Sequence, residues 1–379
     1  MATKKTITKA KAPKKKAEPA DEGMTPSVVT NAQRDALQRD LLAWYTKSKR
    51  DLPWRRSRDP YAIWLSEIML QQTRVDTVIP YYERFLTAFP TLRALADAPI
   101  DTVLTQWSGL GYYRRARMLH AGAKALADGG FPKTAAELRN VPGIGPYTAG
   151  AVASIAWGEQ APLVDGNVAR VLARIFAVTV DVRKGAGHRK IWEIAGELVP
   201  KERAGDWNQA LMELGALLCT PDQPKCLLCP VRGECRAFAE GRTDVIPLRV
   251  AQTKPIEWKR AALVLRRGDT VLLGQRHDHL VFGGLYEPPM FEDDDEELPR
   301  ALKRAAGGAI TFVERITHVL SHRKMRIRIF SATSQPSRAW QTQLESEYKS
   351  FRFVKERDLG GLPMGELAKK VLRAVGTKI

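Results

Sequence analysis

Residues 139–170 constrain the fold of this chain more than any other stretch, because two glycines interrupt a helical pattern there. The stretch reads RNVPGIGPYTAGAVASIAWGEQAPLVDGNVAR. Gly143 and Gly145 can adopt positive φ or let another backbone come close, and the helix after them presents its positive end at the turn. A glycine turn of this kind is more often an ordinary tight turn. It can also bind a phosphate, with Tyr147 and Asp165 following it in the chain.

The charge balance favours a polyanionic partner. The 379 residues include 60 Lys and Arg against 42 Asp and Glu, for a net charge of +18. A basic excess of this size indicates nucleic acid before a membrane surface. The sequence has no apolar run long enough for a membrane span and no apolar N-terminal segment typical of secretion. We therefore expect a cytoplasmic, nucleoid-associated protein without a membrane partner.

Composition divides the chain into four parts, with two folded domains expected from the length. Residues 1–26 have nearly no large apolar side chains and predict a disordered basic tail. Residues 27–240 show helical periodicity without a convincing strand, which predicts an all-α domain. Residues 241–257 are typical of a linker. Residues 258–379 predict an α+β domain that opens with a β-hairpin turning at Gly268.

Two carboxylates stand out from their surroundings. Glu67 is the only charged residue among the ten of segment 61–70, YAIWLSEIML. It is either the buried partner of an arginine or, because burial raises a carboxyl pKa, a proton donor near neutral pH. Asp165 is either the N-cap of a helix over 166–177 or an ionised acid that stabilises positive charge on a sugar. Two acids with pKa values pushed apart commonly divide such work.

The cysteines predict a metal centre. They follow the pattern Cys-x6-Cys-x2-Cys-x5-Cys at Cys219, Cys226, Cys229 and Cys235. Clustering of this kind in a chain without an export signal favours a metal over a disulfide framework. Four thiolates can hold zinc or an iron–sulfur cluster, and the spacing alone favours zinc.

Several segments together resemble one known family. The words SEIMLQQT at 66–73, VIPYY at 78–82 and VDGNV at 164–168 are similar to the A/G-mismatch adenine glycosylases (MutY family). These belong to the helix-hairpin-helix iron–sulfur glycosylases, and the resemblance covers nearly everything from residue 31 onward. It implies a multi-domain fold, with an all-α helix-hairpin-helix glycosylase domain and an α+β Nudix-like C-terminal domain.

The resemblance implies a role for each acid. The family residue that matches Glu67 is the catalytic acid, and Asp165 would stabilise the charged sugar. Tyr147 and Asn167 would support the acids and the sugar. Lyase-type relatives such as endonuclease III have a nucleophilic lysine at the position of Tyr147, so the resemblance implies base hydrolysis without Schiff-base strand cleavage.

The resemblance also implies contacts with DNA. Gly143 and Gly145 would grip the DNA backbone. Gln72 and Tyr112 would wedge into the stack that a flipped base leaves, although core packing is the alternative for Tyr112. Arg55, in the word LPWR, would lie near the adenine pocket.

The remaining implications concern the cofactor and the second domain. The helix at 207–216, WNQALMELGA, resembles the one that precedes the [4Fe–4S] loop of endonuclease III and the adenine glycosylases, which implies that cluster in place of zinc. Ser321 and His322 match the family loop that inspects 8-oxoguanine, but Leu320 stands where the family commonly has Phe. The spaced acids of the Nudix hydrolase box are missing, so a second active site is not expected.

The sequence thus predicts a monomeric, monofunctional adenine DNA glycosylase of base excision repair. It would bind duplex DNA with adenine opposite 8-oxoguanine or guanine, flip the adenine and hydrolyse its N-glycosidic bond. One alternative is an endonuclease III-like glycosylase for damaged pyrimidines, against which Tyr147 and the second domain argue. The other is a noncatalytic iron–sulfur DNA-binding protein, in which Glu67 and Asp165 would be structural.

Overall fold

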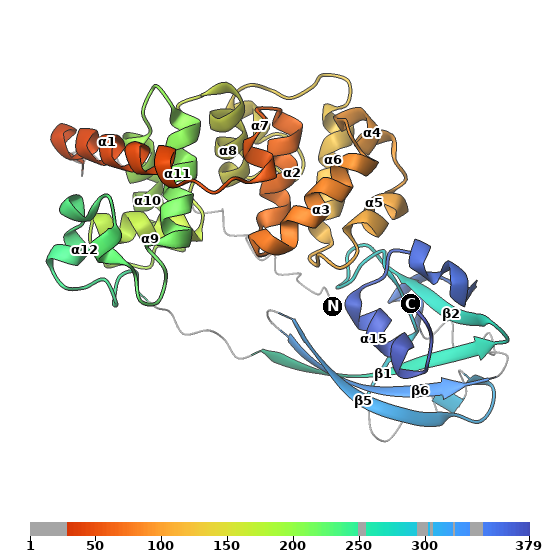
Figure 1. Cartoon of the computed structure of the whole chain (residues 1–379). Coiled ribbons are helices and arrows are strands. Elements are labelled where there is room, and N and C mark those ends of the chain that lie inside the picture. Colours follow the sequence, from red (N-terminus) through yellow and green to blue (C-terminus); the bar gives the residue numbers. More distant parts are fainter. Residues whose placement is uncertain (1–28, 249–254, 294–301, 304–305, 321–322, 334–343) are drawn as a thin grey trace, which may run out of the picture.

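The computed structural model confirms a helical domain followed by a domain built on a β-sheet (Figure 1). The predicted basic tail, Ser321 and His322 lie outside the described residues. Within the part of the chain that is described, no helix is both long and apolar enough to cross a membrane. The structure describes residues 29–248, 255–293, 302–303, 306–320, 323–333 and 344–379.

Helices α1 to α12 form the first domain, and no strand occurs among its described residues. Their bounds, with three 3-10 helices, are α1 (Asn31–Ser48), η1 (Pro53–Arg55), α2 (Pro60–Leu70), α3 (Val75–Ala88), α4 (Leu92–Asp97), α5 (Ile100–Trp107), α6 (Arg114–Leu126), α7 (Ala135–Leu138), α8 (Pro146–Trp157), α9 (Gly166–Ile175), α10 (Gly185–Leu198), α11 (Ala204–Leu217), η2 (Cys226–Leu228), η3 (Arg232–Glu234) and α12 (Arg236–Ala239).

Local capping fixes where the helices near the site begin. Asp59 accepts a hydrogen bond from the Tyr61 N–H at 3.1 Å, and Pro60 takes the first helical position of α2. Ahead of the hairpin, Thr134 accepts from the Glu137 N–H at 3.3 Å and donates to its carboxylate at 2.7 Å. The pair resembles a capping box, but the donor to the Glu137 carboxylate is the Thr134 hydroxyl and not the Thr134 backbone N–H. Both starts agree with the sequence pattern.

The helical domain has two hydrophobic cores, and α8 lies between them. The first includes the fully buried Trp64, Phe85 and Trp107 of α2, α3 and α5. The second includes Leu41 and Trp207 of α1 and α11. Helix α8 packs against both α2 and α11, so side chains at its N-terminal end can meet residues of both cores.

The second domain is a mixed sheet in the order β3-β2-β1-β6-β5, with β4 also paired to β1 and β7 to β2. Strands β1 and β6 are parallel. The predicted hairpin is present, because Arg267 pairs with Thr270 around Gly268, whose φ is 57°. Strand β1 begins within the range predicted as a linker. The bounds are β1 (Ile256–Arg267), β2 (Thr270–Arg276), β3 (Tyr286–Glu287), β4 (Met290–Glu292), β5 (Thr311–Leu320), β6 (Arg323–Ala332), β7 (Tyr348–Lys355), η4 (Glu356–Gly361) and α15 (Glu366–Ala374).

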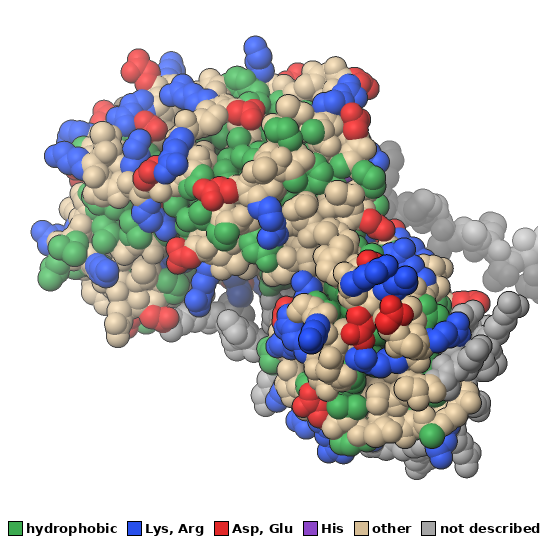
Figure 2. Space-filling model, turned by 45° about the vertical axis from the view of Figure 1, so that its right-hand side comes forward, with side chains coloured by type: hydrophobic (Ala, Val, Ile, Leu, Met, Phe, Trp, Pro, Cys, Tyr) green, Lys and Arg blue, Asp and Glu red, His purple; other side chains and the backbone are tan. Residues whose placement is uncertain are grey.

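The two lobes lie against each other (Figure 2), and a contact between them comes from Ser108, in the turn between α5 and α6. The Ser108 hydroxyl donates to the Met364 carbonyl at 2.7 Å. Arg117 of α6 donates to the Asp278 carboxylate and the Gly283 carbonyl of the second domain. Polar contacts from one face of the helical domain therefore fix the position of the sheet domain beside it.

Candidate active site

A cleft of about 570 Å³ brings together side chains that are far apart in the sequence. Its walls come from η1, α2, α8, α9, α11 and the loop after α2. The predicted site residues that line it are Arg55, Glu67, Gln72, Tyr147, Asp165 and Asn167. Two acids, a phenol, two amides and a guanidinium thus face one space that can admit a ligand.

Glu67 is buried in this cleft, with only 5% of its surface exposed. Its side-chain partner is Tyr147, whose hydroxyl donates to the carboxylate at 2.5 Å. Burial raises the pKa of Glu67 to about 7, even though the Tyr147 hydrogen bond favours the charged form. The carboxyl group can therefore hold or release a proton close to neutral pH, as a general acid must.

Asp165 is the N-cap of α9 and also reaches the cleft. One carboxylate oxygen accepts from the Val168 N–H at 2.7 Å, and the other accepts from the Asn167 side-chain amide at 3.2 Å. Burial raises the pKa of Asp165, while these hydrogen bonds oppose that rise by favouring the charged form. The predicted cap is real, and the same carboxylate lines the cleft.

Tyr147 stands at the start of α8, where the hairpin ends. Besides Glu67, its hydroxyl contacts the Met212 sulfur at 3.2 Å. Burial raises the pKa of the Tyr147 phenol well above its ordinary value, so it stays a proton donor to the acid. A phenol has no amine with which to form a Schiff base.

A further carboxylate in the cleft, the buried Glu213 of α11, was missed by sequence reasoning. Arg50 and Arg55 donate to it at 2.7 and 2.9 Å, and its side chain is 1% exposed. Burial would raise the pKa of Glu213, but hydrogen bonds from the two arginines outweigh it and lower that pKa to about 2. Arg55 therefore faces the cleft already paired with an acid. Glu213 is also a lone charge in an apolar stretch, and the reasoning applied to Glu67 could have found it.

The hairpin glycines differ from each other. Gly143 has φ 83°, and a Cβ atom there would lie 2.9 Å from the Met118 Cβ atom. Gly145 has φ −87°, caps α8 with extended backbone and has open space around it. The conformational freedom of glycine is thus required at Gly143, while Gly145 leaves the N-terminus of α8 uncovered.

Gln72 and Tyr112 project from two neighbouring loops. Both have positive φ, 58° for Gln72 and 49° for Tyr112, which is unusual for residues with a side chain. Tyr112 is 42% exposed, so it is not a core residue. Gln72 is exposed as well.

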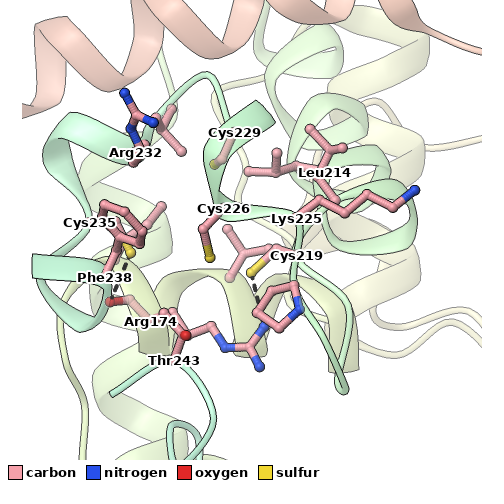
Figure 3. Close-up of a pocket in the computed structure, with 15 residues that line it drawn as sticks. Arg174, Leu214, Cys219, Lys225, Cys226, Cys229, Arg232, Cys235, Phe238 and Thr243 are labelled. Atoms are coloured by element: carbon pink, nitrogen blue, oxygen red, sulfur yellow. Dashed lines mark hydrogen bonds between the residues drawn. The ribbon is translucent and has the colours of Figure 1, made fainter. Parts of the chain in front are cut away.

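The four cysteines line one pocket between α9, α11 and α12 (Figure 3). They form no disulfides and are half-buried. Arg174 of α9 donates to the Cys219 sulfur at 3.3 Å. In the described residues, no three His, Cys, Asp or Glu side chains are grouped to hold a single metal ion. Four thiols are nonetheless the donor set that zinc and iron–sulfur clusters take.

Comparison with known proteins identifies both domains. The HhH-GPD superfamily of base excision DNA repair proteins matches residues 65–197, and the NUDIX domain matches residues 260–374. Adenine DNA glycosylase of Homo sapiens is 36% identical, over 83% of this chain and 71% of that protein. Adenine DNA glycosylase of Arabidopsis thaliana is 42% identical, over 67% of this chain. The chain spans 47% of the length of that plant relative.

A solved structure resembles the helical domain. A thermostable thymine-DNA glycosylase has 29% sequence identity and a TM-score of 0.51 to this chain. The match covers 55% of this chain and 98% of the other. The similarity to known glycosylases is therefore found in the arrangement of the helices as well as in short sequence motifs.

Proposed function

The chain belongs to the adenine DNA glycosylase family, and from this membership we propose that it removes adenine from DNA by hydrolysing the N-glycosidic bond. One observation on the structure supports the proposal in addition to membership of the family. The cleft pairs a buried acid whose pKa is about 7 with a second carboxylate held by hydrogen bonds. Expelling adenine needs a proton on the base and a negative charge near the sugar, and Glu67 and Asp165 meet these two needs.

The reaction can be followed through the residues of the chain. Glu67 transfers its proton to a ring nitrogen of the flipped adenine, and the bond between the base and the sugar C1′ breaks with its electron pair going to the base. The sugar becomes positively charged, and the Asp165 carboxylate stabilises that charge. Water then adds to C1′, and its proton passes to the Glu67 carboxylate. The products are free adenine and an abasic strand.

Tyr147 and Asn167 would position the two acids. The Tyr147 hydroxyl holds the Glu67 carboxylate, and the Asn167 amide holds an oxygen of Asp165. Since Tyr147 has no amine, the abasic strand would stay intact. This argues against the alternative of a pyrimidine-damage glycosylase with lyase action.

We propose that Cys219, Cys226, Cys229 and Cys235 hold a [4Fe–4S] cluster, as the family resemblance implies. The support from the structure is that the four thiols line one pocket without disulfides. When bound, such a cluster would cross-link the segment between α11 and α12 and supply no atom to base hydrolysis. Arg170 lies between this segment and the site, because it donates to the Cys219 carbonyl and to the Asn167 side chain, both at 2.8 Å.

The proposed substrate is duplex DNA with adenine opposite 8-oxoguanine or guanine, bound by a monomer. One chain supplies every side chain of the cleft, so a second copy is not needed for the chemistry. Recognition of 8-oxoguanine is assigned to the second domain through Ser321 and His322. A hydrogen-bonding side chain that loses its partner with plain guanine would discriminate between the two bases.

Duplex substrates test the activity and its alternatives. We expect excision of adenine opposite 8-oxoguanine and guanine, no excision of thymine glycol, and strand cutting only after alkali. Asp165→Asn should keep mismatch binding and lose turnover, because it removes charge from the transition state. Thymine glycol excision with strand scission would favour the pyrimidine enzyme. Binding without any excision would favour a noncatalytic role.

The role of the second domain needs a separate comparison. The double change Ser321→Ala with His322→Ala should lower the single-turnover rate on adenine opposite 8-oxoguanine by at least about tenfold. The rate on adenine opposite guanine should change little. Both duplexes are compared at one salt concentration, because phosphate contacts make affinity depend on salt. Equal losses on the two duplexes would remove the assignment of lesion reading to these residues.

A further inference from the structure

One arginine, Arg115 of α6, contacts both of the loops that carry Gln72 and Tyr112. On the first loop its guanidinium donates to the Thr73 hydroxyl at 3.1 Å and to the Gln71 carbonyl. It also donates to the Ile68 and Met69 carbonyls, at 3.0 and 2.9 Å, at the end of α2. These acceptors flank Gln72, so the loop is fixed on both sides of that residue.

The second loop accepts from Nη2 of Arg115, the same nitrogen that donates to the Thr73 hydroxyl. Arg115 donates to the Gly111 carbonyl at 3.2 Å, directly before Tyr112. Its guanidinium carbon lies 5.2 Å from the centre of the Tyr112 ring and 5.5 Å from that of Trp107. A planar guanidinium with five N–H donors can make such a set of contacts, whereas a single ammonium group cannot span them.

Both loops need to be held. Gln72 and Tyr112 are in the left-handed backbone region, which residues with a side chain occupy only when their surroundings enforce it. Both side chains are exposed, so neither is buried in a core. Arg115 donates hydrogen bonds to the residues next to each of them, Gln71 and Thr73 on one loop and Gly111 on the other.

We propose that Arg115 is a positioning residue for base extrusion, which holds the Gln72 and Tyr112 loops together in the conformation that presents both side chains to DNA. This inference rests on the proposed function, because it assumes that the enzyme flips a base. It assigns Arg115 no contact with the base or with the reacting atoms. A plain helix C-cap, in which Arg115 only satisfies the last carbonyls of α2, is the competing explanation.

The test uses the full chain with Arg115→Lys, which keeps the positive charge and removes the planar set of guanidinium N–H donors. Arg93→Lys is the matched control, because Arg93 lies in the same domain, has a side chain that is 55% exposed and pairs with the exposed acids Asp97 and Asp128. Single-turnover excision is measured on adenine opposite guanine and on adenine in a single-nucleotide bulge. In the bulge there is no partner base, so extrusion costs less free energy.

We expect Arg115→Lys to lose about tenfold on the paired substrate and no more than about twofold on the bulge. Extrusion itself is read from the fluorescence of 2-aminopurine at the target position opposite guanine. In a Glu67→Gln background, Arg115→Lys should lower this signal at saturating protein, while Arg93→Lys should not. The pH dependence of the remaining excision should stay that of the native protein.

Equal losses on paired and bulged adenine with unchanged fluorescence would overturn the inference, as would no loss at all. If Arg115→Lys does not fold, Thr73→Val serves in its place, since it removes one acceptor on the Gln72 loop. It should cost about threefold on the paired substrate and spare the bulge. Failure of the native protein to excise adenine would instead refute the proposed function, and the fluorescence comparison would still decide the role of Arg115.

Discussion

Replacing Glu67 with glutamine should make the protein more stable at alkaline pH while removing most of its activity. The pKa of Glu67 is about 7 in the folded protein, against an ordinary value of 4.5. The folded state therefore binds one more proton than the unfolded state between these values. The free energy of unfolding falls as pH rises from about 4.5 to about 7, and the full loss persists above that. Glutamine does not titrate and escapes this loss.

The size of the effect follows from the shift. One pKa unit corresponds to ~1.4 kcal/mol, so ionising Glu67 in the folded protein costs on the order of 3 kcal/mol. Glutamine can still accept the hydrogen bond from Tyr147 through its carbonyl oxygen. At pH 8, Glu67→Gln should thus raise the melting temperature of the helical domain by roughly 5 to 10 °C. At pH 4 the two proteins should melt nearly together.

Glu213 offers a matched control in the same cleft. Its pKa is lowered to about 2 by Arg50 and Arg55, so the stability it contributes is present above about 4.5 and lost as pH falls toward 2. Glu213→Gln removes the charge and leaves two arginines short of a partner, which should cost about 3 kcal/mol at pH 8. Two identical substitutions should therefore shift the melting temperature in opposite directions.

Melting is followed by circular dichroism at several pH values, and excision by single turnover at the same values. Activity should fall about a hundredfold or more in Glu67→Gln, as expected for loss of a general acid. In the native protein the rate should decline as pH rises through 7, because the protonated acid is depleted. If Glu67→Gln melted below the native protein at pH 8, Glu67 would be ion-paired like Glu213, and its assignment as the acid would fail.

Four further substitutions test other parts of the site. Tyr147→Lys should gain trapping by borohydride, because a lysine amine would then face the sugar carbon; an untrappable variant that still excises adenine would place residue 147 away from that carbon. Gly143→Ala should destabilise the protein by at least ~1 kcal/mol, since its φ is 83° and Met118 occupies the space of a Cβ atom. Gly145→Ala should change the melting temperature little, and equal effects would contradict the geometry. Cys229→Ser should lower the iron content of the purified protein, and native protein that binds zinc in place of iron would refute the cluster.

Much of the local structure near the site could be predicted from the sequence, because it depends on contacts between residues that are close together in the chain. Asp59 and Thr134 cap their helices through contacts with residues two or three positions away. The order of the sheet could not be predicted this way. Strands β1 and β6 pair in parallel, with Ile256 opposite Arg323, and nothing in either strand specifies a partner so far along the chain. The backbone conformation of Gly145 could not be predicted either, since a glycine permits positive φ without requiring it.

The two glutamates show most clearly what the pattern leaves undetermined. Glu67 is the only charged residue of α2, Glu213 is the only one in residues 207–217 of α11, and each is almost fully buried. The pKa of Glu67 is raised and that of Glu213 is lowered. The difference comes from Arg50 and Arg55, which lie 163 and 158 residues before Glu213 in the chain. Burial can be inferred from a helix's own residues, but the sign of the pKa shift depends on which side chain the fold brings opposite the carboxylate. A proton donor and a structural ion pair therefore look alike in sequence and become distinct only once α11 packs beside η1.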